Sequence, residues 1–504
     1  MQLKKIKKII IFGGGTSGWL TAAYLVNNLQ IPTEISLIEN VASGPIGVGE
    51  GTQPYTASFL YKCGIKPKQW MKPSNASFKY GVELIGWNKE PYFVDNDTNN
   101  NCVIAEDLYT PDYFIDKPYS EFSKWQPSYR LAKQNICQKF DDYLDVNPHM
   151  GPENFGAVHF SALEIIKTIK DIIGNKITHI DANITKVITT NDGIESLISD
   201  KNQRYTADLF IDCSGFESRL LEQELAVPFK NYSRWLLNDR AVVMQTQYTD
   251  PEKECFPYTR ATAMNAGWRF TIPIFTRTGN GYVYSSKFIS DEDAERELRE
   301  SLNDFETPVR KIFMKTGAHK EIANKNVCAV GLSAGFVEPL EATGITFTTG
   351  VVNMLTNALN STGNVWSPTS RGLINQGFNH MATEILAFVW AHYHFSTKDD
   401  TPYWQAVRSQ KIEDLPEEAQ HILNQFLPKP GRFLLLTPYS MFNIVQWFSM
   451  LHAGGAYNGV KSQLTDKQKA YAEYFVKSVE SRVALAEKMF KNQHQYLKEW
   501  YNND

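Results

Sequence analysis

The chain has 504 residues, of which 42% are hydrophobic and 21% are charged, and its 51 Lys and Arg residues against 55 Asp and Glu residues give a formal net charge of −4. This composition excludes a disordered, collagen-like or supercharged protein, because apolar residues are abundant and neither sign of charge dominates. A near-neutral balance also provides no field for binding nucleic acid or an acidic membrane. We therefore expect a globular protein that acts on small molecules.

Six cysteines lie far apart, and none of them forms a C-x-x-C pair. Neither a disulfide framework nor a zinc site is indicated, so we expect no metal and a reducing, cytoplasmic location. The apolar start at residues 9–12 superficially resembles a signal peptide, but it breaks at once into three glycines. The most apolar later stretch, residues 433–451, contains too many polar side chains for a bilayer span.

The first forty residues predict a strand, a helix and a second strand. Residues 8–12 form an apolar run typical of a buried strand, residues 17–29 have helical apolar spacing, and residues 34–39 again favour a strand. Together they have the size of a βαβ nucleotide-binding crossover.

The rest of the chain is predicted more coarsely. Residues 86–155 are rich in Asn, Asp, Pro, Tyr and Trp and indicate an insertion or cap over a site. A helical pattern is expected over 157–173, alternating short strands over 177–199 and a buried strand over 207–212. Residues 240–290 are expected to be rich in strands, and the chain beyond 290 to be mostly helical. Thr465 and Gln468 form a capping-box pattern at the start of a long C-terminal helix.

Residues 13–18 read G-x-G-x-x-G between the first strand and the first helix, the context in which this motif indicates dinucleotide binding. Gly13 permits a tight turn, Gly15 lets a pyrophosphate approach the backbone, and Gly18 lets the helix pack on the strand. Glu39 ends the second strand, where a carboxylate can accept hydrogen bonds from a ribose. The alternative is a glycine-rich turn that binds no ligand.

The motif does not by itself distinguish NAD from FAD. Residues 207–215 and 326–335 each form a buried strand followed by a turn of small residues, which favours a flavin. The second segment leads through residues 338–344 into an apolar helix. The start of that helix would present N–H groups and a positive dipole to a flavin anion or a halide.

At this point the sequence resembles the flavin-dependent halogenases of the tryptophan halogenase type. The matching segments occur in the family's order, and they are GGGTSGW at 13–19, GVGEGT at 47–52 with Pro54, FKYG at 78–81, GWRFTIP at 267–273, GYVYSS at 281–286, GLSAGFVEPLEATG at 331–344 and HYHFSTKDDTPYW at 392–404.

The resemblance implies a reaction and its residues. Reduced flavin and O2 would form a C4a-hydroperoxide that oxidises bromide or chloride to hypohalous acid, which would pass through an internal tunnel to an electron-rich aromatic such as indole or tryptophan. Lys79 matches the catalytic lysine that activates the hypohalous acid, either as an ammonium or by forming a haloamine. Glu341 matches the catalytic glutamate, Thr343 and Gly344 match the halide site, and residues 47–52 match the strap that links the flavin and substrate sites.

The resemblance also implies a fold and a set of cofactor-binding residues. The expected fold is α/β, with an FAD-binding Rossmann-type domain like that of flavin monooxygenases and a mainly helical substrate-binding part packed on it. The expected division is 1–86 for the FAD-binding βαβ region, 87–155 for the cap, 156–360 for the remainder of the FAD-binding domain and 361–504 for the helical region. The expected FAD-binding residues are Gly13, Gly15, Thr16, Ser17, Gly18, Glu39, Gly49, Gly331 and Leu332.

Two positions depart from the family pattern. The family's W-x-W-x-I-P motif, which is thought to keep substrate from the flavin, reads here Trp268, Phe270, Ile272 and Pro273, with phenylalanine in place of the second tryptophan. Phenylalanine keeps an aromatic wall but loses bulk and an N–H donor, so the separation could leak. Gly51 stands where many members have alanine, which could loosen communication between the sites.

Several alternatives stay open at this stage. A flavin-dependent hydroxylase on the same scaffold would insert oxygen, and a flavin-binding redox sensor would have no turnover.

A separate NAD(P)H-dependent flavin reductase is expected to supply FADH2, and a homodimer is one possible assembly. The native substrate is open, because no amino-acid-binding segment can be matched onto residues 450–461. Aromatic residues that could contact it are Trp87, Tyr92, Phe93, Tyr109 and Trp447.

Overall fold

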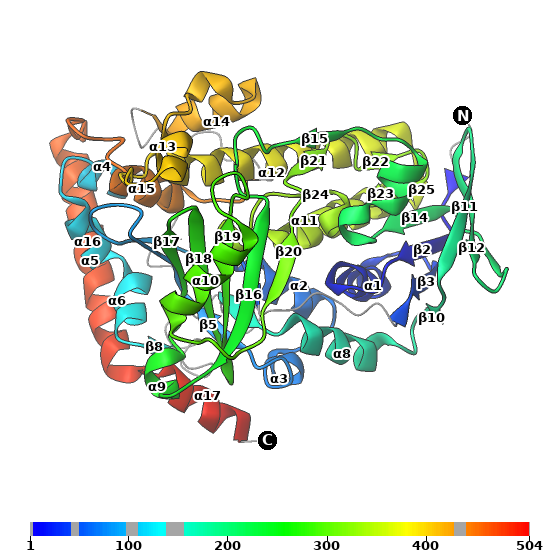
Figure 1. Ribbon diagram of the computed structural model, residues 1–504, viewed down its shortest axis with the longest axis horizontal. Coiled ribbons are helices and arrows are strands. Elements are labelled where there is room, and N and C mark those ends of the chain that lie inside the picture. Colours follow the sequence, from blue (N-terminus) through cyan, green and yellow to red (C-terminus); the bar gives the residue numbers. More distant parts are fainter. Residues whose placement is uncertain (1–3, 42–49, 97–108, 138–155, 428–439, 503–504) are drawn as a thin grey trace.

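The computed structural model describes residues 4–41, 50–96, 109–137, 156–427 and 440–502. Two large sheets form the centre of the molecule, and a layer of helices from the C-terminal third covers one side of them (Figure 1). The expected α/β fold, with a Rossmann-type sheet and a helical part packed on it, is confirmed by this architecture.

The first sheet is built around the predicted βαβ unit. Strand β2 pairs in parallel with β3 on one side and with β14 on the other, and β14 pairs in parallel with β23. The predicted first strand, helix and second strand are confirmed within one or two residues. The elements, with the strands in sheet order, are β10 (Thr178–Asp181), β3 (Glu34–Glu39), β2 (Lys8–Phe12), β14 (Leu209–Asp212), β23 (Val327–Ala329) and β22 (Ala323–Asn324), with helices α1 (Thr16–Asn28) and α8 (Ala162–Ile173) packed on one another.

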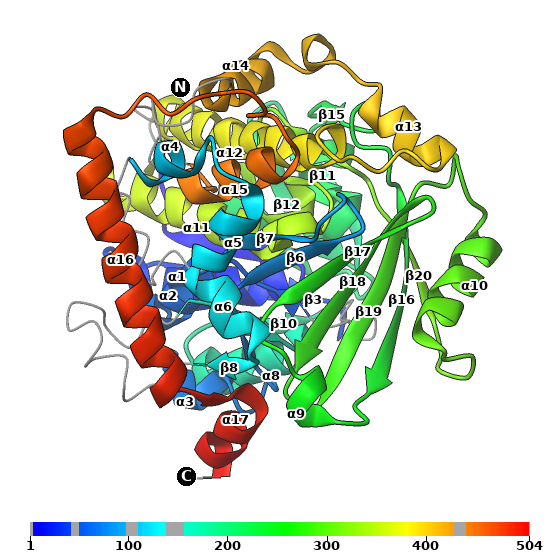
Figure 2. The same cartoon turned by 90° about the vertical axis from the view of Figure 1, so that its left-hand side faces the viewer.

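The second sheet is largely antiparallel and forms the broad wall seen at the front of Figure 2. Its strands β6 and β7 pair across residue 86, where the sequence suggests a boundary between parts. That fourfold division of the chain stays a prediction. The strands, in sheet order, are β20 (Arg310–Phe313), β16 (Arg240–Gln247), β19 (Arg277–Tyr284), β18 (Gly267–Ile274), β17 (Thr259–Met264), β6 (Gly81–Ile85) and β7 (Tyr92–Asp95).

A small third sheet joins these parts, and it corrects one expectation. Residues 157–173 are expected to be helical throughout, but Ala157–Phe160 forms strand β9, and helix α8 begins at Ala162. All four β9 residues are buried, because this strand pairs with β4 (Glu50–Gly51) on one side and β5 (Ser77–Lys79) on the other. Such pairing is decided by partners distant in the chain, which local periodicity does not contain.

The C-terminal region is helical, but short strands at Arg310–Phe313 and Gly317–His319 lie where mostly helices are expected. Strand β23 is the buried strand expected within residues 326–335. The capping box at Thr465 is confirmed, and its helix α16 runs along one side of the molecule in Figure 2. The helices are α11 (Thr343–Ser361), α12 (Pro368–His394), α13 (Pro402–Arg408), α14 (Glu417–Phe426), α15 (Ile444–Ala453), α16 (Asp466–Met489) and α17 (Gln493–Asn502).

Further helices and strands lie between these elements. They are α2 (Tyr55–Lys62), α3 (Pro67–Trp70), α4 (Thr110–Phe114), α5 (Tyr119–Trp125), α6 (Pro127–Lys133), α9 (Pro251–Glu254), α10 (Asp291–Leu302), β1 (Lys4–Lys5), β8 (Ile136–Cys137), β11 (Ile184–Thr190), β12 (Gly193–Ser199), β13 (Arg204–Tyr205), β15 (Phe229–Asn231), β21 (Gly317–His319), β24 (Gly335–Phe336), β25 (Val365–Trp366) and β26 (Lys491–Asn492). Within the described ranges, no helix combines the length and apolar character that crossing a bilayer requires.

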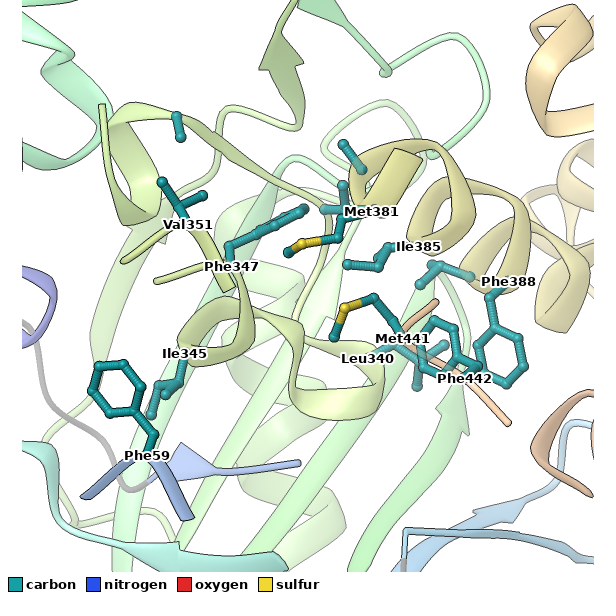
Figure 3. Close-up of a cluster of buried hydrophobic side chains, with 14 of the residues drawn as sticks. Phe59, Leu340, Ile345, Phe347, Val351, Met381, Ile385, Phe388, Met441 and Phe442 are labelled. Atoms are coloured by element: carbon teal, nitrogen blue, oxygen red, sulfur yellow. The ribbon is translucent and has the colours of Figure 1, made fainter. Parts of the chain in front are cut away.

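A buried apolar cluster surrounds the turn that leads into α11. Figure 3 shows Met381, Ile385 and Phe388 of α12 facing Leu340 of this turn and the segment that holds Phe442. The rings of Phe388 and Phe442 stack with centroids 3.8 Å apart. These side chains therefore exclude water from one side of the turn at residues 340–342.

The turn after β14 depends on one buried carboxylate. Asp212 is fully buried, and it accepts hydrogen bonds from Ser214, through its backbone N–H and its hydroxyl, and from the N–H groups of Leu220 and Leu221. An unpaired buried donor costs about 1–3 kcal/mol.

We predict that Asp212→Ala lowers the free energy of unfolding by about 3 kcal/mol or more, because three backbone N–H groups lose their acceptor. Denaturant unfolding measures this change. Asp192→Ala, at an exposed turn, is the control and should stay within about 0.5 kcal/mol of the parent protein. Equal stabilities of the two variants would contradict this role of Asp212.

Candidate active site

Glycine-rich turns meet at the edge where the parallel strands of the first sheet end. Gly13 has a φ of 116°, and a Cβ there would lie 2.3 Å from the backbone oxygen of Cys213. A Cβ on Gly18 would lie 1.9 Å from the backbone oxygen of Gly13. These two positions therefore require glycine, as the sequence predicts. Nothing lies within 4 Å of a Cβ built on Gly15, so the backbone there faces open space.

The open space continues along this edge. A Cβ on Gly215, in the turn after β14, or on Gly344, in the first turn of α11, would also meet nothing within 4 Å. Thr16 begins α1 beside Gly15, so the unpaired N–H groups of a helix N-terminus face the same region. A dinucleotide needs bare backbone and such N–H groups around its pyrophosphate, and the residues present fit that requirement.

The later glycine motif packs against the first one. Gly331 has a φ of 69°, and a Cβ there would lie 2.1 Å from Ser17 Oγ. The Ser17 hydroxyl is 2.9 Å from the hydroxyl of Thr348 on α11. Leu332 follows in a short 3-10 turn and is half-buried. The structure thus brings together predicted cofactor-binding residues that lie more than three hundred positions apart.

Glu39 ends β3 at the same edge, as predicted for an acid beside a ribose. Its Oε1 lies 2.9 Å from Lys170 Nζ and 2.8 Å from His179 Nε2. Its Oε2 lies against Gly14, where an added Cβ would be 1.8 Å away. Two basic side chains therefore fix this carboxylate in place.

The strap expected over residues 47–52 is described from residue 50 onward, and Gly49 lies outside the described residues. Strand β4 pairs Gly51 with His159 of β9. A Cβ on Gly51 would lie 3.5 Å from both Ala342 and His159, an ordinary contact distance. Alanine would therefore fit at this position, and glycine leaves that contact unmade.

Lys79 is the last residue of β5 and is only 1% exposed. Its Nζ donates a hydrogen bond of 3.0 Å to the backbone oxygen of Thr52, the last residue of the strap segment. Thr52 is itself held by hydrogen bonds to Val158 of β9 through its N–H and its hydroxyl. The small sheet thus places a buried ammonium group against the end of the strap.

Glu341 lies in the turn immediately before α11 and is also 1% exposed. Its φ of 65° and the φ of 56° at Ala342 are left-handed, which is uncommon for residues other than glycine and typical of functional sites. Gln53 Nε2 donates to the backbone oxygen of Glu341 at 2.6 Å, and Asn96 Nδ2 donates to its Oε2 at 3.4 Å. Residues from the strap side and from the end of β7 therefore hold the turn and its carboxylate.

Lys79 and Glu341 are close enough to shift each other's pKa. Burial lowers the pKa of Lys79 below its ordinary value, and the charge of Glu341 opposes this shift. Burial raises the pKa of Glu341 above its ordinary value, and the charge of Lys79 opposes that shift. Because little solvent reaches either group, each charge depends on the other, and both groups can exchange protons nearer to neutral pH than exposed side chains do.

Thr343 and Gly344 open the 19-residue helix α11, two and three residues after Glu341. The Thr343 hydroxyl donates to the backbone oxygens of Val337 and Glu338 at 3.2 and 3.3 Å. The N–H groups of a first helical turn have no intrahelical partner, and the helix dipole is positive there. Together with the space beside Gly344, this arrangement is suited to a small anion.

The altered W-x-W-x-I-P motif, with Phe270 in place of the second tryptophan, lies on β18. Its residues Trp268, Phe270 and Ile272 alternate with other residues and share one face of the strand. The Phe270 ring covers Gly281 of β19, where an added Cβ would lie 2.2 Å from the ring. The backbone oxygen of Pro273 accepts a hydrogen bond of 2.6 Å from Ser77, two residues before Lys79. The motif therefore adjoins the strand of the buried lysine.

Three polar side chains near Glu341 are not singled out by the sequence analysis: Gln53, Asn96 and His392. Gln53 follows the strap motif, and His392 opens the segment 392–404, so both lie beside recognisable sequence. Asn96 carries no such signal. Of the aromatic residues considered for the substrate, Tyr92 lies closest to this group, with its hydroxyl 2.7 Å from His392 Nδ1.

Comparison with known proteins identifies the family of this chain. The tryptophan halogenase family model matches residues 8–470. A 7-chloro-L-tryptophan 6-halogenase of Kutzneria sp. (strain 744) is 30% identical over 518 residues, which cover 97% of this chain and 98% of that protein.

Solved structures show the same fold over the whole chain. A tryptophan halogenase from Shewanella frigidimarina superposes with a TM-score of 0.86 at 25% identity and covers 99% of this chain and 98% of its own. A flavin-dependent halogenase from Xanthomonas campestris has a TM-score of 0.84 at 25% identity, with 98% of both chains covered. The resemblance noted in the sequence is confirmed, and the chain belongs to the tryptophan halogenase family of flavin-dependent enzymes.

Proposed function

We propose that Lys79 and Glu341 carry out the final steps of a halogenation of an electron-rich aromatic compound, in a chamber separate from the flavin. The observation that carries this proposal is the burial of one ammonium and one carboxylate together, against the strap and the start of α11. Buried charges are costly unless they are paired, so their presence here favours a chemical role.

The glycine-rich edge is suited to hold FAD. Gly13, Gly15 and Gly18, with Thr16 and Ser17, would contact the pyrophosphate, Glu39 the ribose, and Gly331 with Leu332 the flavin side. The reduced cofactor, when bound, supplies with O2 the oxidant that converts halide into hypohalous acid. The N–H groups of Thr343 and Gly344 would bind the halide at the positive end of α11.

Lys79 would deliver electrophilic halogen to the ring. As an ammonium, its Nζ can donate a hydrogen bond to hypohalous acid and so polarise the O–halogen bond. As an amine, which burial makes more accessible, it can form an N–halogen bond and release water. Both routes need the same Nζ atom, held by Thr52 at the end of the strap.

Glu341 would act on the substrate ring. A carboxylate beside the ring stabilises the cation that forms when halogen adds, and it then accepts the proton that the ring carbon loses. Burial raises the pKa of Glu341, which strengthens it as a base. Asn96 holds one oxygen of this carboxylate.

The substrate class follows from this chemistry and from the relatives. Electrophilic halogenation requires an electron-rich ring, and the Kutzneria relative acts on a chlorinated tryptophan. We propose indole or tryptophan as the substrate type, with FADH2 supplied by a separate flavin reductase. A hydroxylase or a redox sensor would leave the buried Lys79 and Glu341 without a role.

We predict that Lys79→Met abolishes halogenation, with a loss of at least about a thousandfold, because the chamber then lacks its halogen-delivering group. FADH2 oxidation should continue nearly unchanged, since that step occurs at the other site. Mass spectrometry of indole with bromide measures the product by its isotope doublet. Unchanged product yield would contradict the role of Lys79.

We predict that Gly15→Ala weakens FAD binding by at least about tenfold without unfolding the protein, because its Cβ would enter the open space where a pyrophosphate fits. Gly18→Ala is the comparison, since its Cβ would collide with the backbone of Gly13 and should lower stability itself. Flavin fluorescence titration and thermal unfolding separate the two effects. Wild-type FAD affinity in Gly15→Ala would exclude this binding mode.

We predict that Phe270→Trp raises the ratio of halogenated to hydroxylated product, because the larger ring closes the wall between the two sites. Liquid chromatography with mass spectrometry gives this ratio for both proteins. If neither protein forms any hydroxylated product, Phe270 already provides a complete barrier.

A further inference from the structure

One oxygen of Glu341 faces a histidine that the reaction described so far does not use. Glu341 Oε1 lies 3.7 Å from His392 Nε2, and both atoms are fully buried. Neither atom has a hydrogen-bond partner among the described residues. The other ring nitrogen, Nδ1, lies 2.7 Å from the hydroxyl of Tyr92.

The neighbours of His392 favour one of its two ring nitrogens as the carrier of the hydrogen. Burial lowers the pKa of His392 to about 3, so the ring is neutral and has one N–H. Burial and the charge of Glu341 raise the pKa of Tyr92, so its hydroxyl keeps its proton. An ionised carboxylate can only accept a hydrogen bond, so Glu341 Oε1 favours the tautomer with the hydrogen on Nε2, and the Tyr92 hydroxyl then donates to Nδ1.

Packing prevents the ring from turning away. The Tyr92 ring lies nearly parallel to the His392 ring, with centroids 6.0 Å apart and an angle of 20° between planes. The Phe388 ring meets the His392 ring edge-on at 5.0 Å. His392 is therefore held between an aromatic neighbour on its own helix and one on β7.

We propose that His392 is a positioning residue for Glu341: its Nε2–H, set by Tyr92, donates to Glu341 Oε1 in the working enzyme and holds the carboxylate ionised and aimed at the substrate. This inference rests on the proposed role of Glu341 as the base. A separation of 3.7 Å is longer than a hydrogen bond, but such contacts in ligand-free sites commonly shorten when substrate binds.

The pH dependence of halogenation should shift in one direction when the Nε2–H donor is removed. The groups that face Glu341 are Lys79 on β5, Tyr92 and Asn96 at β7, and His392 on α12; His159 of β9 faces Lys79. A donor on Nε2 stabilises the ionised carboxylate and lowers its pKa. Removing that donor raises the pKa of Glu341, so the acid limb of the rate profile moves to higher pH.

Two substitutions separate the nitrogen atoms of the ring. In His392→Gln, the amide N–H can reach the position of Nε2, whereas in His392→Asn it reaches only that of Nδ1. With indole, bromide and reductase-supplied FADH2, we expect His392→Asn to halogenate about tenfold more slowly, with its acid limb about one pH unit higher. His392→Gln should retain most of the wild-type rate, and the acid limb of its rate profile should lie at the same pH as in the wild type.

His380→Asn is the matched control, because His380 lies on the same helix three turns earlier. It should keep the wild-type rate and profile. An unshifted acid limb in His392→Asn would overturn the proposal, whereas wild-type halogenation by Glu341→Gln would instead overturn the proposed role of Glu341 itself.

A measurement on the folded wild-type protein does not depend on any variant's stability. Nitrogen-15 chemical shifts of labelled histidine distinguish the two neutral tautomers, with the His392 signals assigned by their loss in His392→Asn. The proposal requires the Nε2–H form. Observation of the Nδ1–H form would overturn it.

Discussion

The site depends on an ammonium and a carboxylate that are buried near each other. Taking an ammonium and a carboxylate out of water costs several kcal/mol for each, and only their attraction and their hydrogen bonds compensate. Lys79 and Glu341 meet this condition through the Thr52 carbonyl, the Asn96 amide and each other. The same desolvation shifts both pKa values toward neutrality, so the burial that makes the pair costly also suits it to proton exchange near neutral pH.

The parallel sheet, the large antiparallel sheet and the small sheet β4-β9-β5 each contribute a different part of the surroundings of this pair. The parallel sheet presents its glycine turns and the N-termini of α1 and α11 to a cofactor, and the antiparallel sheet supplies the aromatic wall on β18. The small sheet joins them, because β9 holds both the strap end at β4 and the lysine strand β5. A left-handed turn at Glu341 holds its carboxylate just before the start of α11, where we propose that it faces the substrate.

The sequence predicts much of this arrangement, and the failures have a common cause. The βαβ unit and the requirement for glycine at Gly13 and Gly18 follow from local periodicity and turn geometry. Strand β9 is missed because its pairing partners lie about 80 to 110 positions earlier in the chain. Asn96 and His392 are missed for the same reason: an amide or an imidazole acquires its role from a distant carboxylate, and no local pattern records that contact.

The burial of the charge pair can be measured directly by following the titration of Lys79 with carbon-13-labelled lysine, assigned by its loss in a Lys79 variant. We predict a pKa for Lys79 below that of ordinary lysines, and a further decrease in Glu341→Gln, because the neutral amide no longer favours the ammonium. A Lys79 pKa equal to that of exposed lysines, or one unaffected by Glu341→Gln, would show that the two groups are not buried together.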